Sequence, residues 1–172
     1  MTRPVLRAAG RPVPLARPLL MGIVNATPDS FSDAGELPST DARLARGRAL
    51  LEAGADILDV GGESASGHRP AVAAAEEIAR VVPVVEGLVA AGALVSVDTH
   101  KPAVAAAAVA GGAAIVNDVS GLRDPELAAV CAGVLAKSGP GSSRICSSAT
   151  PAAIAASMRS ARKPATSPTT SS

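Results

Sequence analysis

The sequence predicts an α/β protein built on a parallel sheet, and two observations support this. Short runs of aliphatic residues alternate with longer segments of helical periodicity, which is the pattern of repeated strand–loop–helix units. Each aliphatic run also ends in a group of polar residues and glycines. The predicted strands cover residues 19–24, 55–60, 93–97 and 113–116, and the predicted helices cover residues 41–53, 71–91, 102–110 and 125–132.

Capping and turn residues mark the ends of these helices. Asp41, or Thr40 before it, is expected to cap the first helix, and Gly54 is expected to end it. Pro102 suits the first position of the third helix, because the N–H that proline lacks has no partner within the helix at that position. Pro83 predicts an irregularity inside the second helix.

Two parallel architectures fit this alternation, a doubly wound sheet and a (β/α)₈ barrel. A dinucleotide-binding doubly wound sheet would need a GxGxxG turn after the first strand, and residues 25–35 contain none. Polar residues stand instead at the carboxyl ends of all the predicted strands, which is how barrel enzymes build their sites. We therefore expect an incomplete (β/α)₈ barrel of the TIM-barrel type, with about four of the eight units.

Composition divides the chain into an N-terminal arm at 1–18, with room for one short β-ribbon, a partial barrel domain at 19–132 and a tail at 133–172. The tail carries five basic residues and no acidic residue, whereas residues 1–132 carry 11 basic and 15 acidic residues. The tail is also rich in Ser, Pro, Ala and Thr, so we expect it to be disordered or loosely attached.

Composition also excludes several classes of protein. One Phe and no Trp or Tyr leave no aromatic platforms for single-stranded nucleic acid. The longest uncharged apolar stretch, residues 103–116, is too short to span a membrane. Cys131 and Cys146 lack the spacing of a zinc site or a disulfide framework. We expect a soluble, cytoplasmic protein that binds neither nucleic acid nor membranes.

Four motifs accompany the predicted strands in order. They read Met21-Gly-Ile-Val-Asn-Ala-Thr-Pro-Asp-Ser-Phe-Ser-Asp33, Asp56-Ile-Leu-Asp-Val-Gly-Gly-Glu-Ser64, Val95-Ser-Val-Asp-Thr99 and Ile115-Val-Asn-Asp-Val-Ser-Gly121. This series resembles the N-terminal signatures of dihydropteroate synthase, over about residues 19–132. The resemblance implies a pterin-binding (β/α)₈ barrel and a transferase of folate biosynthesis. Such an enzyme joins 6-hydroxymethyl-7,8-dihydropterin diphosphate to 4-aminobenzoate and releases diphosphate, to which Mg²⁺ is bound.

The resemblance also implies roles for individual residues. Asn25 resembles the family's magnesium ligand, and an amide oxygen suits that cation. Asp98 resembles the carboxylate that hydrogen-bonds the pterin ring and faces the positive charge that develops as diphosphate leaves. Asn117 resembles a pterin-binding amide. Further candidates for substrate binding are Asp29 and Asp33 in the first loop and Arg69 in the second.

Structural roles are the alternatives for several of these residues. Asp98 could serve only to cap the following helix, and Asn117 could serve only to satisfy turn amides. For Asp59 and Glu63, a substrate site and a structural hydrogen-bond hub are both open. His100 is expected to be an ordinary loop residue, because no partner at a defined spacing supports a catalytic role.

Two departures from the family pattern bear on activity. Ala65 stands where the family's second loop has Thr, and Arg69-Pro70 follow only after an insertion. The family's C-terminal half contributes further substrate-binding motifs, and residues 133–172 do not resemble them. We therefore hypothesise a truncated descendant of a dihydropteroate synthase, read out of frame after Ala132, and expect the chain to be inactive on its own. The alternatives are a non-catalytic pterin-binding or interaction fragment, including a half-barrel that forms a homodimer, and an inactive pseudogene product.

Overall fold

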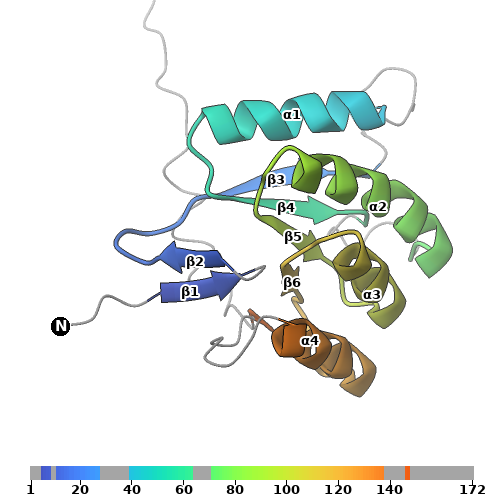
Figure 1. The fold of residues 1–172 in the computed structure, drawn as a ribbon. Helices are drawn as coiled ribbons and strands as arrows, with labels where there is room; N and C mark the ends of the chain where they lie inside the picture. The colour runs from blue at the N-terminus through green and yellow to red at the C-terminus, as the bar shows by residue number, and fades with distance from the viewer. Residues whose placement is uncertain (1–4, 9–10, 28–38, 64–70, 138–145, 148–172) are drawn as a thin grey trace, which may run out of the picture.

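The computed structural model describes residues 5–8, 11–27, 39–63, 71–137 and 146–147. It begins with an antiparallel hairpin of β1 (Val5–Ala8) and β2 (Arg11–Pro14), which matches the short ribbon expected for the N-terminal arm. Strands and helices then alternate along the chain (Figure 1).

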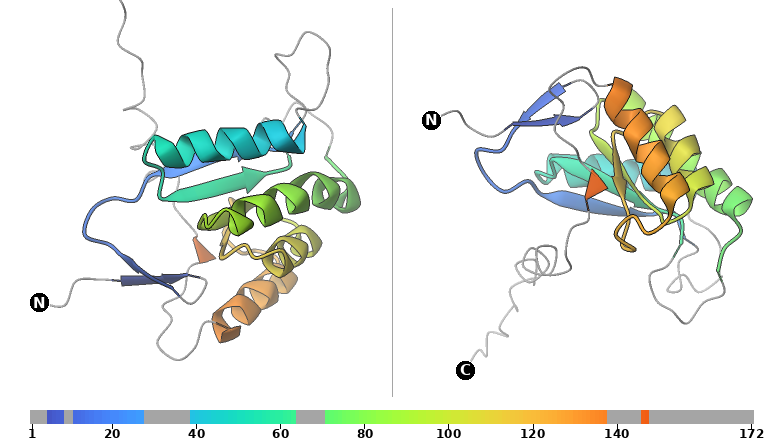
Figure 2. Two further views of the ribbon diagram at one scale, coloured as in Figure 1. Left: turned by 45° about the horizontal axis from the view of Figure 1, so that its top comes forward. Right: turned by 90° about the horizontal axis from the view of Figure 1, so that it is seen from below.

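A parallel sheet forms the centre of the molecule, with its strands in the order β3-β4-β5-β6-β7. The strands are β3 (Met21–Asn25), β4 (Ile57–Gly61), β5 (Val95–Asp98), β6 (Ile115–Asn117) and β7 (Cys146–Ser147), and the helices are α1 (Thr40–Glu52), α2 (Ala74–Ala90), α3 (Pro102–Ala110) and α4 (Pro125–Lys137). All of these helices lie on one side of the curved sheet (Figures 1 and 2). A doubly wound protein would have helices on both faces, so the arrangement confirms the barrel-type fold.

Local sequence explains where the helices begin and end. The Ser39 hydroxyl caps α1 by accepting a hydrogen bond from the Ala42 N–H at 3.1 Å, so the cap lies just before the expected residues Thr40 and Asp41. Pro102 is the first residue of α3, as expected. Gly112, which follows α3, has a φ of 104°, a backbone conformation that residues with a side chain rarely adopt.

Helix α2 is continuous through Pro83, so the irregularity expected there does not interrupt it. Pro83 lies on the exposed side of the helix, where the carbonyl that loses its hydrogen bond can reach water. The neighbouring Val81 and Val84 are fully buried against the sheet. Their burial stabilises the helix against the loss of one backbone hydrogen bond.

The hydrophobic core lies between the sheet and the helices. Val60 and Val97 from the strands and Leu88 from α2 are 0 % exposed. Gly47 allows α1 to approach α2 closely, because a Cβ atom at that position would lie 2.5 Å from Leu88 Cδ2. Since the helices close this side of the sheet to solvent, a substrate can reach only its other face or its ends.

The hairpin closes the end of the sheet where the strands begin. Ala8 of β1 packs there with Ile57 and Ile115, the first residues of β4 and β6. On β3, at the edge of the sheet, Met21 and Ile23 are 40 % and 45 % exposed. In a closed barrel this face would fill the interior, and the carboxyl ends of the strands would carry the site.

Part of the predicted tail is ordered. Helix α4 continues beyond the expected end at Ala132, and Asn117 in β6 pairs with Ser147 in β7. The sequence does not indicate this fifth strand, which is two residues long.

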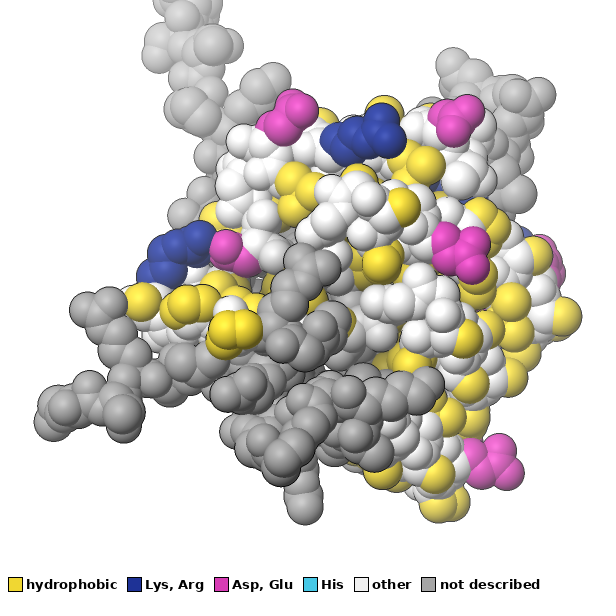
Figure 3. All heavy atoms as spheres, in the orientation of Figure 1, with side chains coloured by type: hydrophobic (Ala, Val, Ile, Leu, Met, Phe, Trp, Pro, Cys, Tyr) yellow, Lys and Arg dark blue, Asp and Glu magenta, His cyan; other side chains and the backbone are white. Residues whose placement is uncertain are grey.

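The outer surface of the helices is rich in alanine. Figure 3 shows hydrophobic side chains over this surface, between well-separated charged groups. Exposed alanines there include Ala75, Ala79, Ala103, Ala106, Ala110 and Ala129. Within the described residues, no helix is both long enough and apolar enough to cross a membrane.

Candidate functional site

The strand register places three of the predicted site residues in one row. Asn25 pairs with Gly61, Gly61 with Asp98, and Asp98 with Asn117, so the row crosses β3, β4, β5 and β6. Register partners in a parallel sheet point their side chains to the same face, here the face away from the helices. Neighbouring strands lie about 4.8 Å apart, so the Cα atoms of Asn25 and Asp98 are about 10 Å apart. The whole row, from Asn25 to Asn117, therefore spans about 14 Å.

Asp98 is the central carboxylate of this row. Its side chain leans over Gly61, where an added Cβ would lie 3.6 Å from Asp98 Oδ2. Burial raises the pKa of Asp98 to about 6, and the nearby carboxylates of Asp59, Glu77 and Asp118 act in the same direction. Among the described residues its carboxylate has no hydrogen-bond partner, and α3 begins after Lys101 without a side-chain cap. The helix-cap alternative for Asp98 is therefore wrong.

The side chain of Asn117 is held in place by Asp59 of β4. The Asn117 Nδ2 atom donates a hydrogen bond of 2.9 Å to Asp59 Oδ2, and both residues are more than 90 % buried. Burial raises the pKa of Asp59, while the polar groups of Ser96 and Asn117 act in the opposite direction. The Asn117 amide thus bonds a carboxylate on another strand rather than turn amides, and Asp59 supports this amide from the next row toward the amino ends of the strands.

Asp118, the residue after this amide, organises the turn that follows β6. Its carboxylate accepts hydrogen bonds from the Ser120 N–H at 2.8 Å, the Ser120 hydroxyl at 2.7 Å and the Leu122 N–H at 2.7 Å. Burial acts to raise the pKa of Asp118, but these hydrogen bonds outweigh it and hold the pKa below its ordinary value. Asp118 therefore shapes the loop beside Asn117 and keeps a negative charge there.

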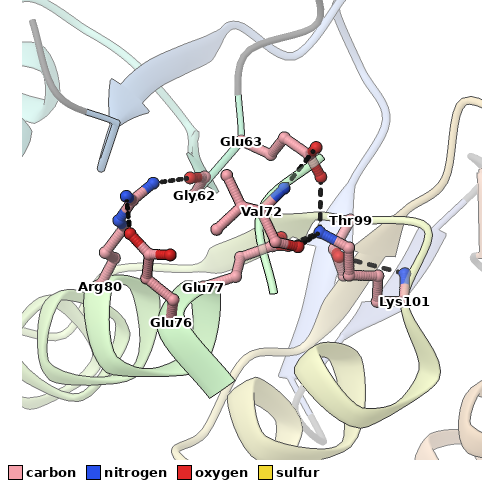
Figure 4. Close-up of polar contacts among 8 residues, drawn as sticks. All are labelled: Gly62, Glu63, Val72, Glu76, Glu77, Arg80, Thr99 and Lys101. Atoms are coloured by element: carbon pink, nitrogen blue, oxygen red, sulfur yellow. Dashed lines mark hydrogen bonds and ion pairs between the residues drawn. The ribbon is translucent and has the colours of Figure 1, made fainter. Parts of the chain in front are cut away.

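Lys101 lies in the third loop, between β5 and α3, and contacts both ends of the second loop, between β4 and α2, as Figure 4 shows. Its ammonium donates to Glu63 Oε2 at 2.6 Å, to the Val72 carbonyl at 2.7 Å and to Glu77 Oε2 at 2.6 Å. The Val72 N–H donates in turn to Glu63 Oε1 at 3.1 Å. Glu63 and Val72 stand on either side of residues 64–70, so Lys101 ties together the two ends of the second loop, three residues after Asp98.

The charges of this cluster are mutually stabilised. The ion pair with Lys101 holds the pKa of Glu63 below its ordinary value. Burial acts to lower the pKa of Lys101, but its bonds to Glu63 and Glu77 outweigh that effect and raise it. Arg80 extends the cluster by donating to the Gly62 carbonyl at 3.2 Å and by pairing with Glu76 (Figure 4). Glu63 thus has a structural role in the described residues, one of the two roles that its sequence position left open.

The structure brings Asn25, Asp98 and Asn117 together, whereas Asp29, Asp33 and Arg69 lie outside the described residues. His100 is exposed, in keeping with a loop residue. Sequence reasoning missed Lys101, Glu77 and Asp118. A lysine three residues after a strand-end carboxylate was the available signal for Lys101, but its partners are 24 to 38 residues away in sequence.

Most of the chain is similar to proteins of one known family. Residues 21–138 match the family described as pterin binding enzyme. Dihydropteroate synthase from Bacillus subtilis is 46 % identical over 116 residues, which are 66 % of this chain and 41 % of that protein. A probable bifunctional folylpolyglutamate synthase/dihydropteroate synthase from Haloferax volcanii is 52 % identical over 108 residues, which are 63 % of this chain and 13 % of that protein.

Solved structures show the same likeness. Dihydropteroate synthase from Xanthomonas albilineans, solved with 4-aminobenzoic acid, superposes with a TM-score of 0.71 at 51 % identity, over 77 % of this chain and 49 % of that one. The enzyme from Burkholderia cenocepacia, complexed with 7,8-dihydropteroate, gives a TM-score of 0.64 at 40 % identity, over 76 % and 43 %. The chain thus spans less than half the length of these proteins. It belongs to the pterin binding enzyme family and, within that family, its relatives are dihydropteroate synthases.

Proposed function

We propose that the chain binds 6-hydroxymethyl-7,8-dihydropterin diphosphate and supplies the pterin side of a dihydropteroate synthase active site. The observation that carries this proposal is the row formed by Asn25, Asp98 and Asn117 at the carboxyl ends of adjacent strands. A free carboxylate and an oriented amide side by side can hydrogen-bond the polar edge of a pterin ring. The likeness to enzymes solved with 4-aminobenzoic acid and 7,8-dihydropteroate supports the same substrates here.

The electrostatics of the site suit the proposed reaction. When diphosphate departs from the pterin methylene, the bonding electron pair leaves with it and a delocalised cation develops on the ring. The negative charges of Asp98, Asp59 and Asp118 lie close enough together to influence one another, as the raised pKa of Asp98 indicates. A fixed cluster of this kind stabilises a developing cation. The amine of 4-aminobenzoate then forms the new C–N bond and releases one proton to the surrounding water.

Magnesium is the proposed metal, and Asn25 is its proposed ligand. The described residues contain no group of three or more His, Cys, Asp or Glu side chains that could hold a metal by themselves. Mg²⁺ does not require such a group, because it keeps several waters and binds through one or two protein oxygens together with substrate phosphates. The exposed Asn25 beside the side-chain-free Gly61 fits that mode. The bound metal would neutralise the leaving diphosphate.

Isothermal titration with the dihydropterin diphosphate, with and without Mg²⁺, tests this proposal. We expect binding that tightens about 10-fold or more with Mg²⁺, because the metal joins the diphosphate to Asn25. In Asn25→Ala the metal-dependent gain should shrink while metal-free binding persists. Absence of binding under both conditions, from a chain that melts cooperatively, would contradict the proposed function.

A further inference from the structure

The pair formed by Asp59 and Asn117 sets the direction of the Asn117 amide. An asparagine amide presents a donor on one branch and an acceptor on the other, and a neighbouring group decides which branch points where. An ionised carboxylate can only accept, so Asn117 must turn its Nδ2 toward Asp59, as the 2.9 Å hydrogen bond shows. The Oδ1 atom then points away from Asp59.

The strand register gives the position of Asp59 relative to Asn117. Asp59 pairs with Ser96 and Ser96 with Ile115, so Asp59 lies in the row of Ile115, two residues before Asn117. Asp59 therefore lies two strands away from Asn117, on β4, and two residues nearer the amino ends of the strands. With one Nδ2 N–H bonded to Asp59, the Oδ1 acceptor and the second N–H of Asn117 are left for a ligand at the carboxyl ends of the strands.

We propose that Asp59 is a positioning residue that fixes the orientation of the Asn117 amide, so that its carbonyl oxygen and the Asp98 carboxylate present two acceptors to the pterin ring. This inference rests on the proposed function and adds a specificity rule to it. The row selects ligands that offer N–H donors to adjacent strands, and it disfavours rings that present acceptors there, because two facing acceptors leave a buried polar atom unpaired.

The surroundings of Asp59 in the protein interior support its role as a positioning residue. Asp59 is 6 % exposed, and its second oxygen, Oδ1, makes no well-formed hydrogen bond among the described residues, nor does the hydroxyl of its register partner Ser96. A buried carboxylate with one poorly paired oxygen is costly to fold, and an apolar residue would fill the layer between Ile23 and Ile115 more cheaply. The hydrogen bond to Asn117 is what an apolar residue could not provide.

Exchanging the two side chains tests the proposal. In Asp59→Asn the amide of Asn117 can adopt either orientation, and in Asn117→Asp two carboxylates face each other. Each single variant should weaken binding of the dihydropterin by about 10-fold, the value of one charge-assisted hydrogen bond. In the double variant D59N/N117D, the amide introduced at position 59 can donate to the carboxylate introduced at position 117. The other oxygen of that carboxylate again faces the ligand, so the double variant should bind more tightly than either single one.

Ile115→Val is the matched control, because it trims a buried side chain in the layer of Asp59 without touching the polar pair. It should leave dihydropterin affinity within about 3-fold of the wild type, since it changes packing alone. Single variants that bind as tightly as the control, or a double variant weaker than both singles, would overturn the proposal.

A second measurement does not depend on any ligand. In the wild type the Asn117 side-chain amide protons should be protected from hydrogen exchange in NMR spectra, and the protection should be reduced in Asp59→Asn, where the amide adopts both orientations. If the wild type fails to bind the dihydropterin but shows this protection, the proposed function fails while the positioning by Asp59 stands. Unprotected Asn117 protons in the wild type would overturn the inference whatever the binding result.

Discussion

The Lys101 ammonium lies 2.6 Å from the carboxylate of Glu77, a side chain on α2 that is only 1 % exposed. The pair joins the first turn of α2 to the residue that precedes α3, immediately beyond the strand end that carries Asp98. Because the same ammonium also binds Glu63 and the Val72 carbonyl, one cation holds the base of the second loop against the third.

Replacing Lys101 by Met should destabilise the fold strongly. The substitution leaves Glu77 as a buried carboxylate without its cation, and breaking a buried pair in this way lowers the free energy of unfolding by about 3 kcal/mol or more. Urea denaturation at neutral pH measures the change. Adding Glu77→Gln to the variant should recover part of the loss, because the uncompensated charge is removed.

Arg17→Met provides the control for this comparison. Arg17 pairs with Asp56 at 2.7 Å, but its side chain is 58 % exposed. An exposed pair of this kind contributes little to stability, so Arg17→Met should lower the free energy of unfolding far less than Lys101→Met does. Equal effects of the two substitutions would contradict the view that the Lys101 cluster is the structural base of the site.

Asp98 should make stability depend on pH. Its folded-state pKa of about 6 lies above the ordinary value of 3.8, so the folded protein holds the proton more tightly than the unfolded chain does. The ionised carboxylate therefore lowers the free energy of unfolding above pH 6, by about 2 kcal/mol after allowance for solvent screening. Asp98→Asn should be more stable than the wild type at pH 8, and the difference should vanish as the pH falls to about 4. A difference that stays constant across this range would contradict the assignment.

Gly62→Ala should perturb the site through packing. A Cβ atom at Gly62 would lie 2.6 Å from Glu77 Cγ and 2.7 Å from Val81 Cγ2, and both of those side chains are buried. Overpacking of this kind destabilises by about 1–3 kcal/mol, measurable as a lower thermal midpoint. Gly133→Ala is the opposite case, because Gly133 lies in α4 with nothing within 4 Å of its added Cβ. That variant should gain about 0.5–1 kcal/mol, so a loss in both would contradict the packing explanation.

The sequence alone predicts the barrel-type alternation and the row of site residues, for physical reasons. Pro102 and Gly112 act through their own backbone preferences, so local sequence suffices to place the ends of α3. Asn25, Asp98 and Asn117 each end an aliphatic run, and in a parallel sheet the carboxyl ends of the strands necessarily meet at one edge.

Other features depend on contacts that local sequence does not encode. The partners of Lys101 lie on α2 and around the second loop, and no spacing rule links them. Pro83 stays within a helix because burial of its neighbours Val81 and Val84 outweighs a local preference. The pairing of Ser147 with Asn117 involves a strand of two residues, which is too short to show a periodic pattern.

The most direct test of the central claim, that Asp98 and its row form a pterin pocket, is calorimetric titration with 6-hydroxymethyl-7,8-dihydropterin. This ligand lacks the diphosphate, so the titration isolates recognition of the ring from the metal. We expect the wild type and the control Glu86→Ala, which changes an exposed residue of α2, to bind equally. Asp98→Ala should bind at least about 10-fold more weakly, because it lacks one charge-assisted hydrogen bond. Equal binding by Asp98→Ala and the control would contradict the claim.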